Sequence, residues 1–561
     1  MRIRRNKSEV AAGSSARITP VFRPAQVEKA APCQAGCANC GDIRGWIGKV
    51  AQRKKAGITR KEAYSQAWSI IAEVNPFPAT LGRICPHPCE NLCNRSDLDE
   101  PLSINAMERF LGDFAIKRAV PLPRLQSAKM KEWVGVVGAG PSGLSFAYQM
   151  ARRGYRVSVY DAREKPGGML RYGVPDFRLP QEVLDAEIEK ILDLGIELEL
   201  NCKIGADVSL ADLRVRHDFL YLGVGAQKGC DLSIPGADGS SVLTGSEYLR
   251  RINCGEKVTL GSRVIVVGGG NTAIDAARCA RRAGSEVTIV YRRSREEMPA
   301  FPGEIEDAIE EGVQLVLLAA PARIERSEDG SLIGAQVTRM ALGSPDSSGR
   351  RRPVPVSGPE CWLTADAVIA AVSQIPVLDG LESAEHKGDW LVSHPGHEGS
   401  EALLAGGDAT GVGIAGNAIM QGRLAAEQLH RRLSGAGAEG EKDGDLHTIN
   451  SEQVLFTSKE SCSAVQPAKL PGELRLAEDK GEFTGTITES QFLAEVDRCF
   501  SCGLCSGCEQ CYMYCTSGCF TPLESPGPGR YFALNLDSCK ECGKCVEVCP
   551  CGFLEVVPAP A

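Results

Sequence analysis

Two cysteine runs close to the C-terminus place the strongest limit on what this chain can fold into. Both runs have the spacing Cys-x2-Cys-x2-Cys-x3-Cys. In this pattern three thiolates of each run surround one [4Fe–4S] cluster, and the fourth thiolate ligates the other cluster. The spacing therefore predicts one cluster held by Cys505, Cys508, Cys511 and Cys549, and a second held by Cys539, Cys542, Cys545 and Cys515. Zinc ribbons also use Cys-x2-Cys pairs, but they do not need the third and fourth cysteines at these positions.

The composition excludes several classes of protein. At 561 residues the chain is too long for one core and should form several domains. The net charge of −8 gives no reason to expect nucleic-acid binding. The basic N-terminus lacks the apolar segment of a secretory signal, and no apolar run is long enough to span a bilayer. Because most of the 24 cysteines are grouped near the chain ends of a long protein, we expect a reduced, cytoplasmic protein rather than a disulfide scaffold.

A glycine-rich turn after residues 133–137 has the context of a dinucleotide-binding site. An apolar strand is expected there, the GxGxxG motif Gly138–Gly143 follows it, and a helix comes next. The first glycine makes the turn, the second lets the backbone approach a pyrophosphate, and the third allows the helix to pack on the strand. Asp161 ends the next expected strand, where a carboxylate binds a ribose hydroxyl. The motif predicts a bound dinucleotide, and the alternative is a turn that serves packing only.

A second turn of the same kind follows residues 263–267. It contains Gly268 and Gly270, with Asn271 and Thr272 at the start of the next helix. No acid ends the following strand, and Arg292 and Arg293 stand there instead. A carboxylate would repel a 2′-phosphate, whereas guanidinium groups pair with one, so this site should bind NADPH or accept both nicotinamides. The alternative is that the two arginines belong to a solvated loop.

The segments around these turns resemble the small subunit of glutamate synthase. The resemblance extends from residue 31 to about residue 433 and includes residues 165–175, 177–180, 291–299 and 405–408. The same architecture occurs in part of dihydropyrimidine dehydrogenase and in the large subunit of the electron-bifurcating ferredoxin:NADP transhydrogenase. The resemblance implies FAD at the first site, held by Gly138, Gly140, Pro141, Ser142, Gly143, Asp161, Gly168, Met169, Arg171, Gly173, Arg178, Gly225, Gly407 and Asp408. It implies NADPH or NADH at the second site, held by Gly268, Gly270, Asn271, Thr272, Arg292 and Arg293.

In that family an N-terminal helical domain holds [4Fe–4S] clusters next to the flavin. By position, one cluster matches Cys37, Cys85, Cys89 and Glu108. A second matches Cys33, Cys93 and Cys40, but this chain lacks two upstream cysteines of the family pattern. The resemblance therefore implies three clusters in all, and a fourth only if the second N-terminal set is complete. We interpret His87 as a structural residue of the cluster loop rather than a ligand.

The tail suggests a narrower resemblance. Residues 498–502, 511–515 and 518–520 are similar to the iron–sulfur flavoprotein that serves dissimilatory sulfite reductase. The implied activity is that of an NAD(P)H:acceptor oxidoreductase, with hydride exchange between nicotinamide and FAD followed by single-electron transfer through the clusters. The implied partner is sulfite reductase, a ferredoxin or a large oxidoreductase subunit. Because the cofactors carry this chemistry, we expect no catalytic acid or base.

Other functions are weighed against the same residues. Flavin disulfide reductases need a redox-active cysteine pair, and no two cysteines of the central region have Cys-x2-Cys or Cys-x4-Cys spacing. A non-catalytic wiring scaffold would have decayed glycine motifs, and both are intact. An electron-input subunit of glutamate synthase, or of another 2-oxoacid or aldehyde oxidoreductase, remains an alternative. The acceptor, the direction of electron flow and the formation of a homodimer stay open, as does the role of Cys499, Cys502, Cys519 and Cys551.

Together these observations predict an α/β protein with a helical iron–sulfur domain, two interleaved Rossmann-like domains and a ferredoxin-like α+β module. We expect a disordered N-terminus over residues 1–30 and a helical [4Fe–4S] domain over 31–125. The FAD domain should comprise residues 130–250 and 379–433 and enclose an NAD(P)H domain over 251–378. A Gly-, Glu- and Ser-rich linker is expected over 434–489, before the 2[4Fe–4S] module of residues 490–561.

Overall fold

The computed structural model describes residues 22–346, 348–358, 360–393, 403–435, 446–477 and 481–558. The described chain forms two compact units. The tail unit comprises the described residues within three ranges, Met1–Ala31, Asp445–Ser461 and Phe500–Ala561. The main unit comprises Pro32–Gly444 and Cys462–Cys499. Of the N-terminal segment expected to be disordered, residues 1–21 lie outside the described residues.

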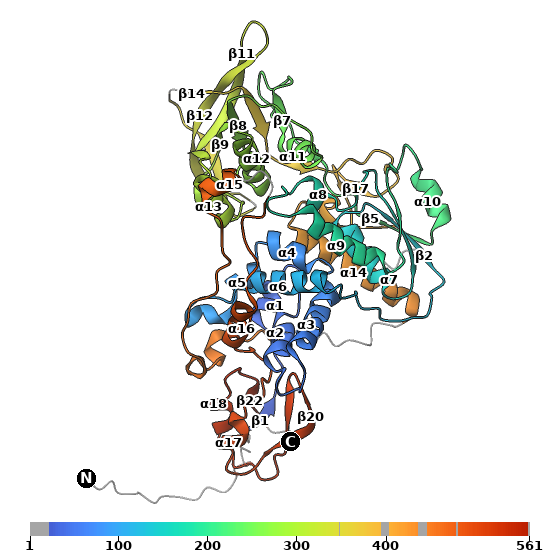
Figure 1. Cartoon of the computed structure of the whole chain (residues 1–561), viewed down its shortest axis with the longest axis vertical. Helices are drawn as coiled ribbons and strands as arrows, with labels where there is room; N and C mark the ends of the chain where they lie inside the picture. The colour runs from blue at the N-terminus through green and yellow to red at the C-terminus, as the bar shows by residue number, and fades with distance from the viewer. Residues whose placement is uncertain are drawn as a thin grey trace, which may run out of the picture. The chain divides into compact units, whose positions relative to one another are not determined.

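The first dinucleotide fold of the main unit is a parallel five-stranded sheet with the order β19-β5-β2-β3-β4. Helix α7 begins at Pro141, where proline is favoured because its missing N–H needs no partner. Figure 1 shows α7 and α14 together beside β2 and β5. The strands are β2 (Trp133–Val137), β3 (Arg156–Tyr160), β4 (Glu197–Glu199), β5 (Phe219–Leu222) and β19 (Leu403–Ala405). The helices are α7 (Pro141–Ala151), α8 (Met169–Tyr172), α9 (Gln181–Leu192), α10 (Leu210–Arg216) and α14 (Ala415–Ser434).

The second dinucleotide fold repeats this topology, with a parallel sheet in the order β10-β9-β8-β15-β7. An antiparallel sheet of four strands is inserted after β10, and the two chain crossings between the folds pair as β6 and β16. The parallel strands are β7 (Val242–Thr244), β8 (Arg263–Val267), β9 (Glu286–Tyr291), β10 (Gln314–Leu317) and β15 (Ala367–Ala370). The other strands are β6 (Lys228–Gly229), β11 (Ala319–Arg326), β12 (Leu332–Pro345), β13 (Arg351–Pro355), β14 (Cys361–Thr364) and β16 (Gln374–Ile375). The helices are α11 (Gly245–Asn253), α12 (Asn271–Arg282) and α13 (Pro302–Glu310).

The N-terminal part of the main unit is helical. Helix α3 starts with a capping box, in which Thr59 and Glu62 satisfy each other's backbone N–H groups. Helix α4 packs against α6, as Figure 1 also shows. The helices are α1 (Pro32–Gly36), α2 (Ile43–Ala51), α3 (Arg60–Val74), α4 (Pro78–Ile84), α5 (Pro88–Asn91) and α6 (Ile104–Lys117), and η1 (Asn94–Asp97) is a 3-10 turn.

The segment expected to be a linker is structured in large part. Helix α15 (Gly472–Ala477) brings Arg475 to Asp307 of α13, with 3.0 Å between the charged atoms. Helix α16 (Glu489–Arg498) packs on α2 and α6, and its buried Phe492 stacks on Phe110 at 4.4 Å between ring centroids. The described residues 462–499 therefore belong to the main unit, because their few apolar and charged side chains find buried partners there.

The tail unit contains the ferredoxin-like residues and a strand from the other end of the chain. Strand β1 (Phe22–Gln26) pairs antiparallel with β22 (Leu554–Pro558). Part of the segment expected to be disordered thus forms a strand. Its polar residues and Pro24 are not typical of a strand, so the sequence did not predict it. The remaining elements are β20 (Phe520–Gly527), β21 (Arg530–Leu534), α17 (Gln510–Tyr514) and α18 (Lys544–Glu547). Within the described residues, no helix combines the length and the apolar character needed to cross a membrane.

Candidate functional site

The first glycine turn has the geometry of a phosphate cradle. Gly138 has φ of +103°, and a Cβ there would lie 2.3 Å from the Gly223 carbonyl oxygen. A Cβ on Gly143 would lie 1.9 Å from the Gly138 carbonyl oxygen, so only glycine permits this helix–strand packing. Gly140 differs, because a Cβ there would meet only the Gly168 Cα, at 3.7 Å. The turn is therefore open at the N-terminus of α7, where the backbone N–H groups and the helix dipole favour a phosphate.

Asp161 follows β3 and supports this turn. Its carboxylate accepts hydrogen bonds from the backbone N–H groups of Ala139 at 2.7 Å and Arg163 at 2.8 Å. Burial raises the pKa of the Asp161 carboxyl, and the two backbone donors act in the opposite direction. The predicted ribose ligand thus stands beside the turn, held in place by main-chain donors.

The second glycine turn is built in the same way. Gly268 has φ of +146°, and a Cβ there would lie 2.2 Å from the Ala371 carbonyl oxygen. Gly270 precedes α12, and a Cβ there would meet only Pro299 Cγ, at 3.9 Å. Asn271 Oδ1 accepts a hydrogen bond from the Phe301 N–H at 3.1 Å, which ties the following loop to the start of α12.

The strand register shows which residue of the second fold corresponds to Asp161. Val137 pairs with Tyr160 in the first fold, and Val267 pairs with Val290 in the second. The residue after Val290 is Tyr291, so a tyrosine, and not an arginine, occupies the position of the acid. A Cβ on Gly269 would lie 2.6 Å from the Tyr291 ring, and the Tyr291 hydroxyl donates to the Glu297 carbonyl at 2.7 Å.

The two predicted arginines have different environments. Arg293 is 4% exposed, and it pairs with Asp346 at 2.6 Å and donates to the Arg351 carbonyl at 2.7 Å. Arg292 is exposed, and both arginines line the cavity described below. Because Arg293 is engaged by Asp346 and the Arg351 carbonyl, Arg292 is the side chain of the two that is available to a 2′-phosphate, and Arg293 ties the end of β9 to the segment between β12 and β13.

One cavity of ≈ 850 Å³ extends from Pro141 of the first glycine motif to Gly268 and Gly270 of the second turn. Ligand sites in proteins commonly have volumes of a few hundred to about 1,000 Å³, so an extended cofactor fits here. The first fold contributes Pro141, Met169 and Gly173, and the second contributes Gly268 and Gly270, with Asn271 and Thr272 from α12. Cys85 of the N-terminal helical part also lines this cavity, and the family resemblance implied a cluster at Cys85 next to the flavin.

Two predicted FAD residues are held by other protein groups. Arg171 is buried, donates to Gln181 Oε1 at 2.7 Å and also bonds the Pro166 carbonyl and Asp185. Arg178 lines the cavity and makes two hydrogen bonds to Asp275, at 2.8 and 2.7 Å. Arg178 thereby joins the loop before α9 to helix α12 of the second fold.

The other predicted FAD residues cluster at the start of α7 and α14. Ser142 Oγ lies 2.6 Å from the Tyr221 hydroxyl, and a Cβ on Gly407 would meet the Ser142 side chain. Asp408 lines the cavity, and its carboxylate accepts from the Gly413 N–H at 3.1 Å. Gly168 has φ of +54° and lies against Gly140, while Gly225 has φ of +68° after β5.

The N-terminal helical part brings one predicted cluster set together. Cys37, Cys85, Cys89 and Glu108 are close enough that their charges act on one another. Burial, followed by the Glu108 charge, raises the pKa of Cys85 to about 12. Glu108 is held by a 2.9 Å hydrogen bond from Asn75, and burial raises the pKa of Glu108 to about 7. Several acidic groups in one buried place fit a metal cluster, because unpaired buried anions are costly.

The remaining N-terminal candidates differ in their surroundings. Cys40 is exposed, has φ of +53° and adjoins Cys37. Cys33 and Cys93 pack against the apolar core formed by α2, α3, α6 and α16. His87 has φ of +44°, and its Nδ1 lies 3.0 Å from the Cys85 carbonyl oxygen, which places it as part of the loop around Cys85.

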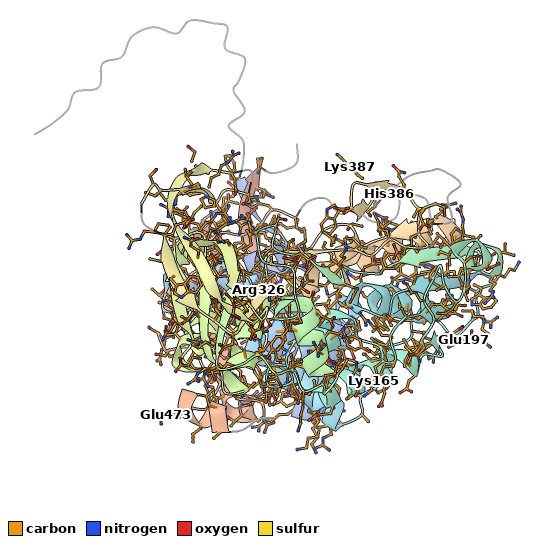
Figure 2. All side chains as sticks on the ribbon, turned by 90° about the horizontal axis from the view of Figure 1, so that it is seen from above. Lys165, Glu197, Arg326, His386, Lys387 and Glu473 are labelled. Atoms are coloured by element: carbon orange, nitrogen blue, oxygen red, sulfur yellow. The ribbon has the colours of Figure 1, made fainter. Side chains whose placement is uncertain are left out.

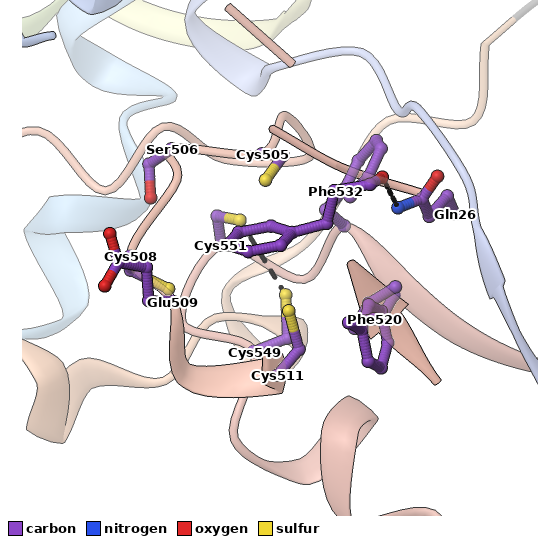
Figure 3. A pocket seen from close by; sticks show the side chains of 12 residues that line it. Gln26, Cys505, Ser506, Cys508, Glu509, Cys511, Phe520, Phe532, Cys549 and Cys551 are labelled. Carbon is purple, nitrogen blue, oxygen red and sulfur yellow. Dashed lines mark hydrogen bonds between the residues drawn. The ribbon is translucent and has the colours of Figure 1, made fainter. Parts of the chain in front are cut away.

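The tail unit gathers the first predicted ferredoxin set around one pocket. Figure 3 shows that Cys505, Cys508, Cys511 and Cys549 line it together with Phe520 and Phe532. Cys551 lines the same pocket, and its sulfur lies 3.8 Å from that of Cys549. The four thiols and the aromatic wall fit a cluster that is shielded from water.

The second ferredoxin set lies beside a second extra thiol. Cys545 lies close enough to Cys515 and Cys542 to interact with them electrostatically. The Cys519 thiol forms hydrogen bonds with Cys515 and Cys539. Among the described residues, no three His, Cys, Asp or Glu side chains form a group that could hold a single metal ion. The cysteine sets are therefore assigned from their spacing in the sequence and their grouping in the fold.

Comparisons with known proteins agree with this geometry. Residues 132–422 match the family described as pyridine nucleotide-disulphide oxidoreductase, which is more than half of the chain. The chain belongs to the pyridine nucleotide-disulphide oxidoreductase family. Residues 23–120 match the 4Fe-4S cluster domain II of dihydropyrimidine dehydrogenase, and residues 532–555 match a 4Fe-4S binding domain. The predicted fold class is thus confirmed, and the protein is an FAD-dependent NADPH oxidoreductase with 4Fe-4S domains.

Three curated relatives are similar to this chain. The β subunit of NADP(+)-dependent formate dehydrogenase from Moorella thermoacetica is 34% identical over 89% of this chain and 73% of its own length. The β subunit of NADPH-Fe(3+) oxidoreductase from Geobacter sulfurreducens is 36% identical over 64% of this chain and 54% of its own length. The glutamate synthase [NADPH] small chain of Azospirillum brasilense is 32% identical over 71% of this chain and 85% of its own length.

The family name includes disulphide chemistry, and the cysteines of the matched region argue against it here. The cavity contains no cysteine from that region among its described lining residues. The cysteines there are Cys202, Cys230, Cys254, Cys279 and Cys361. The chain therefore shares the family's dinucleotide folds while its cysteine-rich parts lie on either side of them.

Proposed function

We propose that the chain takes hydride from NADPH and delivers single electrons to a protein acceptor. The cavity of ≈ 850 Å³ carries this proposal, because Pro141 of the first glycine motif, the glycines of the second turn and the cluster candidate Cys85 line it together. When bound there, FAD accepts a hydride from NADPH and can release its electrons singly to [4Fe–4S] clusters. A cavity that reaches both nucleotide turns and a cysteine fits an enzyme that couples these two kinds of transfer.

The chain's own residues bind and orient the cofactors. The open N-terminus of α7 at Gly140 would hold the FAD pyrophosphate, and that of α12 at Gly270 would hold the NADPH pyrophosphate. Arg292 would pair with the 2′-phosphate. The bonds from Arg178 to Asp275 fix the two folds relative to each other, which keeps the nicotinamide aligned with the flavin.

Electrons would leave through the tail unit. Its two cysteine sets supply eight thiolates, Cys505, Cys508, Cys511, Cys515, Cys539, Cys542, Cys545 and Cys549, which is the complement of two clusters. Cys508 and Cys542 are exposed, so a partner protein can approach each set closely.

The acceptor we propose is the catalytic subunit of a larger oxidoreductase. Two of the relatives carry the name of a β subunit, one of formate dehydrogenase and one of an Fe(3+) oxidoreductase. Dissimilatory sulfite reductase and a ferredoxin remain candidates on the resemblance of the tail. Co-purification of the natively expressed chain would identify the catalytic subunit by the protein bound to it.

Replacing two tail ligands tests the electron route. The double variant C508S/C542S should lose about eight irons per chain, because each substitution removes one ligand of a four-iron cluster. NADPH-dependent reduction of a small dye should persist, since both glycine turns are unchanged, while reduction of the co-purified partner should stop. Full partner reduction by this variant would show that electrons leave from elsewhere.

A further inference from the structure

We propose that Cys33, Cys93 and Cys499 ligate a further [4Fe–4S] cluster in the N-terminal helical part. The main unit then contains two clusters, and the second uses Cys499 at the end of α16, far downstream of the N-terminal helices in the sequence. This inference does not depend on the identity of the electron acceptor.

The arrangement of α1 and α5 separates the N-terminal cysteines into two sets. Cys33 lies in α1 and Cys37 directly follows that helix, whereas Cys89 lies in α5 and Cys93 stands between α5 and η1. Helices α1 and α5 are packed so closely that a Cβ on Gly36 would lie 3.1 Å from the Cys89 Cα. Cys37 and Cys89 lie in the set around Glu108, which leaves one cysteine of each pair, Cys33 and Cys93, for a second set.

Cys499 is attached to the Cys93 region by buried charged groups. Arg95, two residues after Cys93, is 2% exposed and donates to the Arg498 carbonyl at 3.0 Å. Arg498 in turn pairs with Asp99 at 2.9 Å and with Glu495 at 2.9 Å. The carbonyl that Arg95 binds is directly followed by Cys499, which caps the end of α16. This network fixes the end of α16 next to the turn that carries Cys93.

The surroundings of Cys93 suit a cluster ligand. Backbone N–H groups of Leu102 and Arg95 bond the Cys93 sulfur, and the Arg498 charge lies near it. Such donors to a ligating sulfur stabilise its negative charge and tune the cluster. Cys33, Cys93 and Cys499 also pack against one apolar core, which would shield a cluster from water.

Iron counting with single variants tests the assignment. The full chain, reconstituted anaerobically, should hold about 16 irons if two main-unit clusters join the two of the tail. C499S, C33S and C93S should each hold about 12 and lose the same electron paramagnetic resonance signal. The double variant C33S/C499S should lose no more iron than either single variant, because both residues serve one cluster.

C462S is the matched control. Cys462 is exposed, its N–H donates a hydrogen bond to Asp99, and Arg95 donates one to its sulfur. Because Cys462 is not a proposed ligand, this variant should keep all iron and every signal. Flavin absorbance reports whether each variant folds. Should C499S fail to fold, C499H keeps a ligand at this place and should retain about 16 irons, with one cluster reduced at a higher potential. The proposal is overturned if C499S keeps all iron, if the double variant loses about eight irons, or if C499H leaves every potential unchanged.

Discussion

The two dinucleotide folds of the main unit share their topology but differ at the end of the second strand of each motif. After β3 stands Asp161, whose carboxylate accepts hydrogen bonds from Ala139 and Arg163. Strand β9 ends at Tyr291, whose ring occupies the space that Gly269 leaves by lacking a Cβ. The first fold thus presents an anion next to its turn, and the second presents a neutral ring followed by the exposed Arg292.

This difference shows how one fold can select two cofactors. A carboxylate suits a ribose hydroxyl, which donates hydrogen bonds, and it repels a phosphate. Removing the acid is as important as adding a base, because an acid beside Arg292 would neutralise it. The pairing of Arg293 with Asp346 also shows that adjacent arginines in a sequence need not share a role.

The largest expected effect comes from filling either cradle. Gly140→Leu should abolish FAD binding, because the backbone there is extended and the added side chain points only into the open turn. Gly270→Leu should leave FAD bound and abolish reduction of the flavin by NADPH. Flavin absorbance after gel filtration and anaerobic rapid mixing measure these outcomes. Full flavin content in the Gly140 variant would contradict the assignment of the first fold.

A smaller effect is expected from the ion pair that joins the two folds. Asp275→Asn removes the anion that makes two hydrogen bonds to the buried Arg178 guanidinium and leaves Glu304 paired with it at 3.2 Å. Breaking a buried pair costs about 3–5 kcal/mol, and denaturant unfolding should show a loss toward the lower end of that range.

The matched control is a surface pair of the first fold. Glu197, labelled in Figure 2, pairs with Arg156 at 2.9 Å, and about half of each side chain is exposed. Glu197→Gln should cost less than about 1 kcal/mol because solvent screens such pairs. Equal losses in the Asp275 and Glu197 variants would refute the joining role of Arg178.

The smallest effect concerns nicotinamide choice. Arg292→Gln should raise KM for NADPH by about thirtyfold, or about 2 kcal/mol, while KM for NADH changes little. Arg293→Gln should affect both nicotinamides equally, because Arg293 holds the loop through Asp346. Steady-state kinetics with both substrates give the comparison. A selective rise of KM for NADPH in the Arg293 variant, and not in the Arg292 variant, would show that Arg293 binds the phosphate.

Local sequence patterns were sufficient to predict the glycine turns and the cysteine sets of the tail. The turns around Gly138 and Gly268 were recognisable because their roles depend on neighbouring strands and helices. The same holds for the cysteine runs, whose spacing alone separates the tail cysteines into two sets. Contacts between distant segments were not readable in this way. The pairing of β1 with β22 and the docking of Phe492 on Phe110 depend on tertiary packing.

The second fold shows the same limit on a finer scale. Arg292 and Arg293 stood out as the replacement for the missing acid, but only the strand register placed Tyr291 at that position. A sequence motif identifies a short stretch, whereas backbone hydrogen bonding decides which of its side chains faces the ligand.

An anaerobic titration of the full chain with NADPH tests the central claim most directly. Visible absorbance follows the flavin and the clusters together, and electron paramagnetic resonance reports the reduced clusters. The account predicts that the protein takes up more reducing equivalents than its flavin alone can hold, with cluster signals appearing as the flavin bleaches. Reduction of the flavin with every cluster left oxidised, even in the presence of excess NADPH, would contradict it.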